Sequence, residues 1–155
     1  MTVNIFHKLF EVWSTSTPQT FTEAVNAPQK TSGELITEVA DGNNLVDGKP
    51  TWFYANEKKN DLSYMLRCCE AEVAIMQVMN LLAAPYYFER TAILLRKSKD
   101  YQREIEICES YIAMAERFYQ NNDPNKYADV RKGPRFQAIV HRISKARQLL
   151  LKVSP

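Results

Sequence analysis

The residue types that perform metal or nucleophilic chemistry are few in this chain, and their spacing is unfavourable. Its 155 residues include two histidines, His7 and His141, and three cysteines, Cys68, Cys69 and Cys108. Zinc sites commonly show C-x-x-C or H-E-x-x-H spacing, and di-iron bundles show E-x-x-H, but none of these occurs here. We therefore expect no metal and no cofactor. The cysteines are expected to act as small apolar core residues, with Cys68 the one thiol left open as a nucleophile.

Acidic side chains offer a second kind of chemistry. Glu106 and Glu109 are three residues apart, which places them on one face of a helix, where two carboxylates could share general acid and base work. The other interpretation is a solvated face or a set of partners for basic residues, and we favour it. The glycine-rich patterns that cradle phosphates, G-x-G-x-x-G and G-x-x-x-x-G-K, are absent. The expectation is a protein that is not an enzyme and has no catalytic residues.

Two aromatic runs could serve binding instead. The run YYF at 86–88 cannot turn all three rings toward one core on a helix, so at least one should be exposed or at an interface. The run WFY at 52–54 places a large apolar surface in a segment expected to be extended. One interpretation is that these rings only close the core, and the other is that they anchor a partner, since Tyr and Trp are enriched at binding hot spots. The candidate aromatic anchors are Trp52, Tyr86 and Tyr87.

The positive charge is concentrated at the end of the chain. The net charge is +2, but residues 124–155 contain eight Lys or Arg against one acid, which gives +7 there and −5 over residues 1–123. An amphipathic last helix would carry these charges on the side away from its apolar residues. That surface could simply be solvated, bind phosphates, or meet an acidic protein, including the acidic half of a second copy. The candidate basic residues are Arg131, Lys132, Arg135, Arg142 and Lys145.

These residues must be positioned by two different kinds of sequence. Residues 5–13 place apolar side chains at helical spacing and predict a short helix, although a short strand is an alternative. Residues 14–30 predict a loop. The β-forming run 34–40, the turn signal at 41–44 and the aromatic run 52–54 predict a small β-hairpin, or two extended arms lying across helices.

From residue 60 the apolar spacing becomes helical. The predicted helices cover about 60–82, 85–97, 100–120 and 134–152. Their start signals are an N-cap at Asn60 or Asp61, proline at the first helical position at Pro85 and Pro134, and an N-cap at Asp100. The basic residues of the last helix, Arg142 among them, are expected on its outer side, with Val140 among the inward residues.

The region from Pro85 to about residue 120 resembles a tetratricopeptide (TPR) unit, a helix-turn-helix repeat. The resemblance rests on Ala92 at the small position of the first helix, on the Arg96-Lys97 ending, and on Asp100-Tyr101 opening the second. Glu104 stands where that pattern has a small residue early in the second helix, and Glu116 stands at the place of its usual proline. The resemblance implies a helical hairpin that binds other proteins.

Taken together, the sequence predicts a single, mainly α domain. It would be a four- to five-helix array over 60–152 with one TPR-like hairpin, preceded by an irregular or β-containing segment at 1–59. No apolar run reaches the roughly 20 residues of a membrane helix, and residues 1–13 lack the features of a signal peptide, so we expect a cytoplasmic protein.

The expected function is non-catalytic protein binding, as an adaptor, regulator or inhibitor, with an acidic partner. The first alternative is a nucleic-acid-associated factor that grips phosphates through the basic helix. The second is a small inhibitor of phage or plasmid type that blocks a host complex. The sequence is also compatible with self-association into a homo-oligomer.

Overall fold

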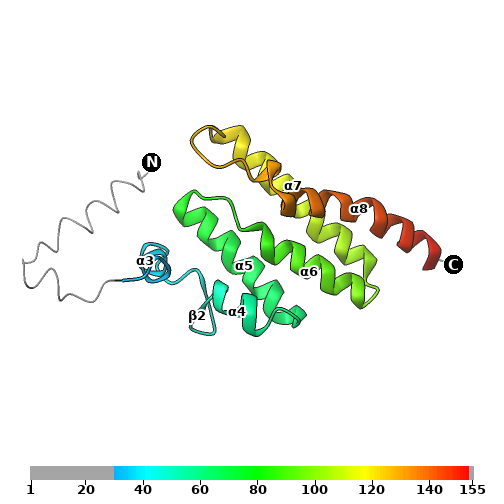
Figure 1. Cartoon of the computed structure of the whole chain (residues 1–155), viewed down its shortest axis with the longest axis horizontal. Coiled ribbons are helices and arrows are strands. Elements are labelled where there is room, and N and C mark those ends of the chain that lie inside the picture. Colours follow the sequence, from blue (N-terminus) through cyan, green and yellow to red (C-terminus); the bar gives the residue numbers. More distant parts are fainter. Residues whose placement is uncertain (1–29, 154–155) are drawn as a thin grey trace, which may run out of the picture.

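The computed structural model describes residues 30–153, and Figure 1 shows their arrangement. The predictions of a helix at 5–13 and of a loop before residue 30 lie outside the described residues. In chain order the elements are α3 (Ser32–Val39), β1 (Leu45–Val46), β2 (Lys49–Pro50), α4 (Thr51–Glu57), α5 (Leu62–Met79), α6 (Pro85–Lys97), α7 (Tyr101–Asn121), a 3-10 turn η1 (Val130–Lys132) and α8 (Pro134–Val153). None of these helices combines the length and apolarity needed to cross a membrane.

The predicted fold class is confirmed: the described chain is mainly helical and has one small antiparallel sheet. The four long helices follow one another in an array in which α6 is central, because it packs against α5, α7 and α8 (Figure 1). Tyr86 and Glu89 of α6 lie beside Arg135 of α8, and Ala92 of α6 lies beside Arg142. The residue numbers of these contacts rise in the same direction along both helices, so α6 and α8 run parallel.

The start signals of the long helices are confirmed. Asp61 caps α5 by accepting hydrogen bonds from the backbone amides of Ser63 and Tyr64. Asp100 caps α7 through the amide of Arg103. Between α6 and α7 the turn closes with Lys99 in the left-handed conformation, at φ 61°. These two aspartate caps fix where α5 and α7 begin.

Replacing Asp61 with alanine should lower the free energy of unfolding by about 1 kcal/mol, because two amides of the first turn of α5 lose their acceptor. The Asp61→Asn variant keeps an acceptor oxygen and should lose clearly less. Urea denaturation of both variants measures the difference. Equal losses for alanine and asparagine would contradict the capping role.

The predicted hairpin exists, but its position was wrong. The run at 34–40 forms α3 rather than a strand, because Thr31 and Glu34 make a reciprocal capping box: the Thr31 side chain accepts from the Glu34 amide, and the Glu34 carboxylate accepts from the Thr31 amide. The run at 52–54 lies in α4. The two short strands are joined by Asp47-Gly48, whose φ angles of 48° and 73° are those of a tight hairpin turn.

The hairpin and α4 are fastened to α5. The Tyr54 hydroxyl donates to the backbone carbonyl of Val46 at 2.7 Å and its ring stacks on Tyr64 at 4.8 Å. Arg67 of α5 forms a two-pronged ion pair with Asp47 in the hairpin turn. These contacts leave Trp52, two residues before Tyr54 on the short helix, on the outer side of α4.

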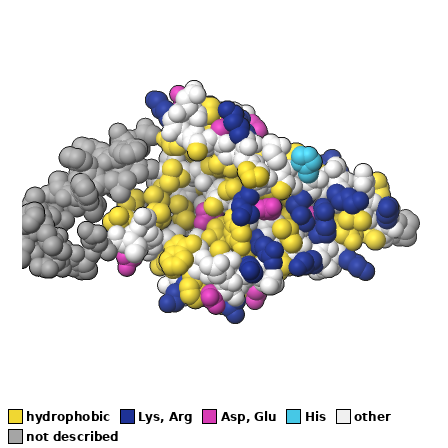
Figure 2. Space-filling view, in the orientation of Figure 1, with side chains coloured by type: hydrophobic (Ala, Val, Ile, Leu, Met, Phe, Trp, Pro, Cys, Tyr) yellow, Lys and Arg dark blue, Asp and Glu magenta, His cyan; other side chains and the backbone are white. Residues whose placement is uncertain are grey.

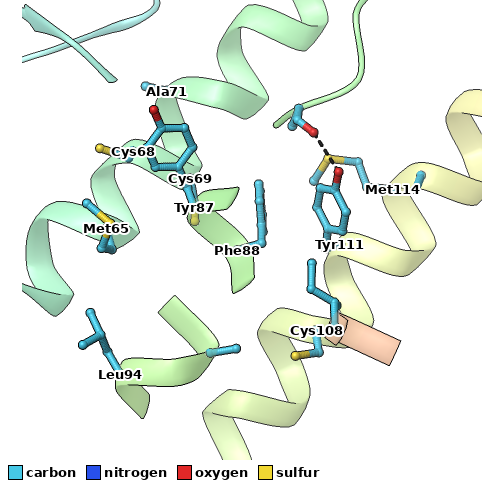
Figure 3. Packing of buried hydrophobic residues seen from close by; sticks show 14 of the residues in the cluster. Met65, Cys68, Cys69, Ala71, Tyr87, Phe88, Leu94, Cys108, Tyr111 and Met114 are labelled. Atoms are coloured by element: carbon cyan, nitrogen blue, oxygen red, sulfur yellow. Dashed lines mark hydrogen bonds between the residues drawn. The ribbon is translucent and has the colours of Figure 1, made fainter. Parts of the chain in front are cut away.

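The main core lies where α5, α6 and α7 meet (Figure 3). Its centre is Tyr111, which is fully buried, packs against Phe88 at 4.6 Å between ring centroids, and donates to the carbonyl of Ala83 at 2.8 Å. Phe136 of α8 adds a third ring at 6.2 Å. An aromatic cluster of this kind ties the fourth helix to the other three.

The three thiols belong to this core, as predicted. Cys68, Cys69 and Cys108 are all buried. Burial raises the pKa of the Cys68 thiol to about 11 and those of Cys69 and Cys108 to about 12. Protonated thiols are poor nucleophiles, so Cys68 has no chemical advantage over the other two.

Glu72 is a largely buried carboxylate that joins three elements. It projects from α5, accepts from the Thr51 hydroxyl of α4 at 2.8 Å, and accepts from the Ala84 amide at 3.0 Å, where α6 begins. The N-cap residue Ala84 makes no side-chain cap, and Glu72 satisfies one free amide at this helix start, that of Ala84 itself. Burial raises the pKa of Glu72 above its ordinary value of 4.5, and the two hydrogen bonds act in the opposite direction.

This raised pKa predicts a measurable pH dependence. The folded protein binds the Glu72 proton more tightly than the unfolded chain does. The protonated carboxyl group therefore makes its full contribution to the free energy of unfolding below pH 4.5, and this contribution is lost as the pH rises through the raised pKa. The advantage of the natural protein over Glu72→Gln should therefore be larger at pH 4.5 than at neutral pH. Urea denaturation of both proteins across this range tests it, and a difference that grows with pH would contradict it.

Candidate protein-interaction site

The junction of α6 and α8 brings together basic side chains that are far apart in the sequence. Arg135, Arg142 and Lys145 follow one another at intervals of seven and three residues, which places them on one stripe of α8. The contacts of Arg135 and Arg142 turn this stripe toward α6, where Arg96 and Lys97 end the neighbouring helix. We call these five residues the α6–α8 basic seam.

A buried ion network forms the floor of the seam. Glu104 of α7 is completely buried, with Arg96 Nε 2.9 Å from its Oε2 and Arg142 Nε 2.9 Å from its Oε1. The Arg142 contact is an ion pair without hydrogen-bond alignment. Arg96 also donates to the backbone carbonyl of Arg142 at 3.0 Å. The two guanidinium groups are thus fixed by one carboxylate that solvent does not reach.

Arg135 is held at the other end of the seam. Its guanidinium donates to the Glu89 carboxylate at 2.7 Å and lies 4.8 Å from the centre of the Tyr86 ring. Tyr86 in turn donates its hydroxyl to the carbonyl of Ala55 at 3.0 Å. A cation stacked on an aromatic ring keeps a defined direction, so this part of the surface is preorganised.

The seam keeps an excess of positive charge. Its five cations face two carboxylates, Glu89 and Glu104, which leaves +3, and Glu104 is fully buried. Lys97 and Lys145 are exposed, and no carboxylate among residues 30–153 lies within 4 Å of either. Figure 2 shows Lys and Arg side chains gathered over the half of the view in which α6 and α8 lie. This surface would attract an anionic partner.

The predicted aromatic anchors are separated by the fold. Tyr87 is buried, at 5% exposure, and belongs to the core, so the prediction that it is available to a partner was wrong. Tyr86 is half-buried under Arg135 and lies at the seam. Trp52 is 59% exposed and lies apart from the seam, on α4 beside the hairpin.

The predicted basic residues divide in a similar way. Arg142 was expected on the outer side of the last helix, which was wrong, because its guanidinium turns inward to Glu104. Arg131 lies in η1, paired with Asp129 and Glu116 and stacked 4.5 Å from the Tyr119 ring. Lys132 beside it is exposed. Neither belongs to the seam, whereas Arg135 and Lys145 do.

Other residues of the site were missed by sequence reasoning. Glu104, Glu89 and Arg96 carry no spacing signal that would pair them with α8, since their partners are 38 to 46 positions away along the chain. Val140, expected inside, is 39% exposed. Apolar periodicity predicts which side of a helix faces the core, but it does not predict which arginine pairs with a buried carboxylate.

Metal chemistry finds no support in this part of the chain: among residues 30–153, no three His, Cys, Asp or Glu side chains gather as ligands would. Comparisons with known proteins found no matching family model, no similar curated protein and no similar solved structure.

Proposed function

We propose that this protein is a non-catalytic protein-interaction module whose α6–α8 basic seam binds an acidic protein surface. The observation that carries the proposal is the excess of +3 along the seam, with Lys97 and Lys145 lacking carboxylate partners among the described residues. Rim charges of this kind raise association rates and select partners of opposite charge. Tyr86 supplies an aromatic surface at one end of the seam, as is common at interfaces.

The preorganisation of the seam favours a folded partner over a nucleic acid. Arg96 and Arg142 are ion-paired with Glu104 and donate to backbone carbonyls, and Arg135 donates to Glu89. A backbone phosphate would have to compete with those partners, whereas an acidic protein surface can be attracted at longer range by the fixed field. Whether the module acts as an adaptor, a regulator or an inhibitor depends on what the partner does.

Affinity capture from nuclease-treated extract of the producing cells tests the proposal with two matched variants. Lys97→Glu/Lys145→Glu reverses two seam charges, and Lys59→Glu/Lys126→Glu reverses two exposed charges elsewhere. We expect a defined protein whose recovery falls at least about tenfold with the seam variant, as 1.4 kcal/mol of lost binding would produce, and stays unchanged with the control.

Two outcomes would contradict the proposal. Equal recovery with both variants would show that the seam is not the contact surface. Loss of every partner on nuclease treatment, together with a steep salt dependence of binding to a DNA or RNA duplex, would favour the nucleic-acid function instead.

A further inference from the structure

An open groove lies between α3 and the β1–β2 hairpin, apart from the seam. It encloses about 480 Å³, and Leu45 and Pro50 line it from the hairpin side. The indole of Trp52 also lines it and lies against Gly33 of α3, where an added Cβ would be 3.1 Å from the indole Nε1. With Trp52 at 59% and Leu45 at 36% exposure, the groove presents apolar surface to solvent.

The α3 wall of this groove is an amphipathic helix without a buried side chain. The wall is also acidic: Glu34 and Glu38 line the groove, and residues 30–41 contain three acids against one lysine, which gives −2. Lys30 pairs with Glu38, whereas no cation of the described residues lies within 4 Å of Glu34. The groove thus fits an occupant that is apolar and basic.

The last turn of α8 has these properties. Leu151 is 78% exposed and Val153 is 60% exposed. Lys152 between them is exposed, and within residues 30–153 no carboxylate lies within 4 Å of it. We call these three residues the α8 tip. In Figure 1 the tip and α3 lie at opposite ends of the described chain, so the tip of one copy does not reach its own groove.

We propose that the groove of one copy binds the α8 tip of a second copy. Leu151 would cover the exposed indole of Trp52, and Lys152, the next residue on the helix, would meet the carboxylates of α3. Within residues 30–153 both surfaces stay exposed, and their charges are opposite. The contact joins two different surfaces, so each copy keeps one further groove or tip for another contact. This inference is independent of the proposed function, because no seam residue takes part.

Light scattering on a concentration series tests the contact with two variants. The groove variant is Trp52→Ser/Glu38→Lys, and the tip variant is Leu151→Ser/Lys152→Glu. All four side chains are exposed, and the tip lies at the end of a helix, so at least the tip variant should fold normally. The natural chain should show a mass that rises above 17.9 kDa with concentration, while each variant alone should stay at the monomer mass.

Light scattering on a mixture of the two variants is the most direct test of the contact. The groove variant keeps an intact tip and the tip variant keeps an intact groove, so an equimolar mixture should recover a species of two chains. A natural chain that remains monomeric up to about 1 mM, where even a weak contact would be half formed, would overturn the proposal. So would a mixture that stays monomeric. The seam variant Lys97→Glu/Lys145→Glu should self-associate normally, which separates this result from a failure of the proposed function.

Discussion

The Glu104→Gln variant is expected to lose about 3 kcal/mol of its free energy of unfolding. The natural carboxylate is fully buried between two arginines, and the amide leaves both guanidinium groups without a counter-charge. Breaking a buried ion pair by removing one partner typically costs about 3 to 5 kcal/mol. The side chains of Arg96 and Arg142 retain 27% and 17% exposure, which allows some hydration and favours the lower end.

The matched control lies on the same helix. Glu109 pairs with Arg147 of α8 at 2.5 Å, but the two side chains are 47% and 61% exposed. Exposed pairs contribute from about 0 to 1 kcal/mol, so Glu109→Gln should be nearly neutral. Urea denaturation of both variants measures the contrast. Similar losses for the two positions would mean that the Glu104 network does not hold α6, α7 and α8 together.

The second large effect is expected at the centre of the aromatic core. Tyr111→Ala should lower the free energy of unfolding by about 4 kcal/mol, because removal of a large buried ring leaves a cavity among Phe88, Phe136 and their neighbours. Tyr111→Phe keeps the ring and loses only the hydrogen bond to the Ala83 carbonyl, which should cost about 1 to 2 kcal/mol.

Thermal and urea unfolding of the two Tyr111 variants would measure this difference. A phenylalanine variant as unstable as the alanine variant would show that the hydroxyl contact to Ala83, rather than ring packing, dominates at this position. An alanine variant of nearly natural stability would contradict the placement of Tyr111 at the centre of the core.

The long helices could be predicted because each shows sustained apolar periodicity and begins at a clear signal, such as Asp100 or Pro134. The short elements were harder to predict, since two local signals competed in the same segment. At 34–40 the β-forming residues suggested a strand, but the capping box of Thr31 and Glu34 starts a helix there. The hairpin turn forms instead at Asp47-Gly48, a pair typical of two-residue hairpin turns.

The site was predictable only in part, for a different physical reason. Lys145 was correctly placed on the surface, because an unpaired lysine on an amphipathic helix stays in water. The direction of Arg142 could not be read from its own helix. The Arg142 side chain turns toward the buried carboxylate of Glu104 on α7. This ion pair forms only when α7 and α8 are packed together.

If the basic seam binds a protein partner, its lysines should become less accessible when that partner is present. Covalent labelling of lysines tests it within single molecules: the purified chain is modified with and without nuclease-treated extract of the producing cells, and each lysine is quantified by mass spectrometry. We expect protection of Lys97 and Lys145, with Lys59 and Lys126 unchanged as internal controls. Equal labelling of all four lysines with and without the extract, or protection of Lys59 and Lys126 alone, would contradict it.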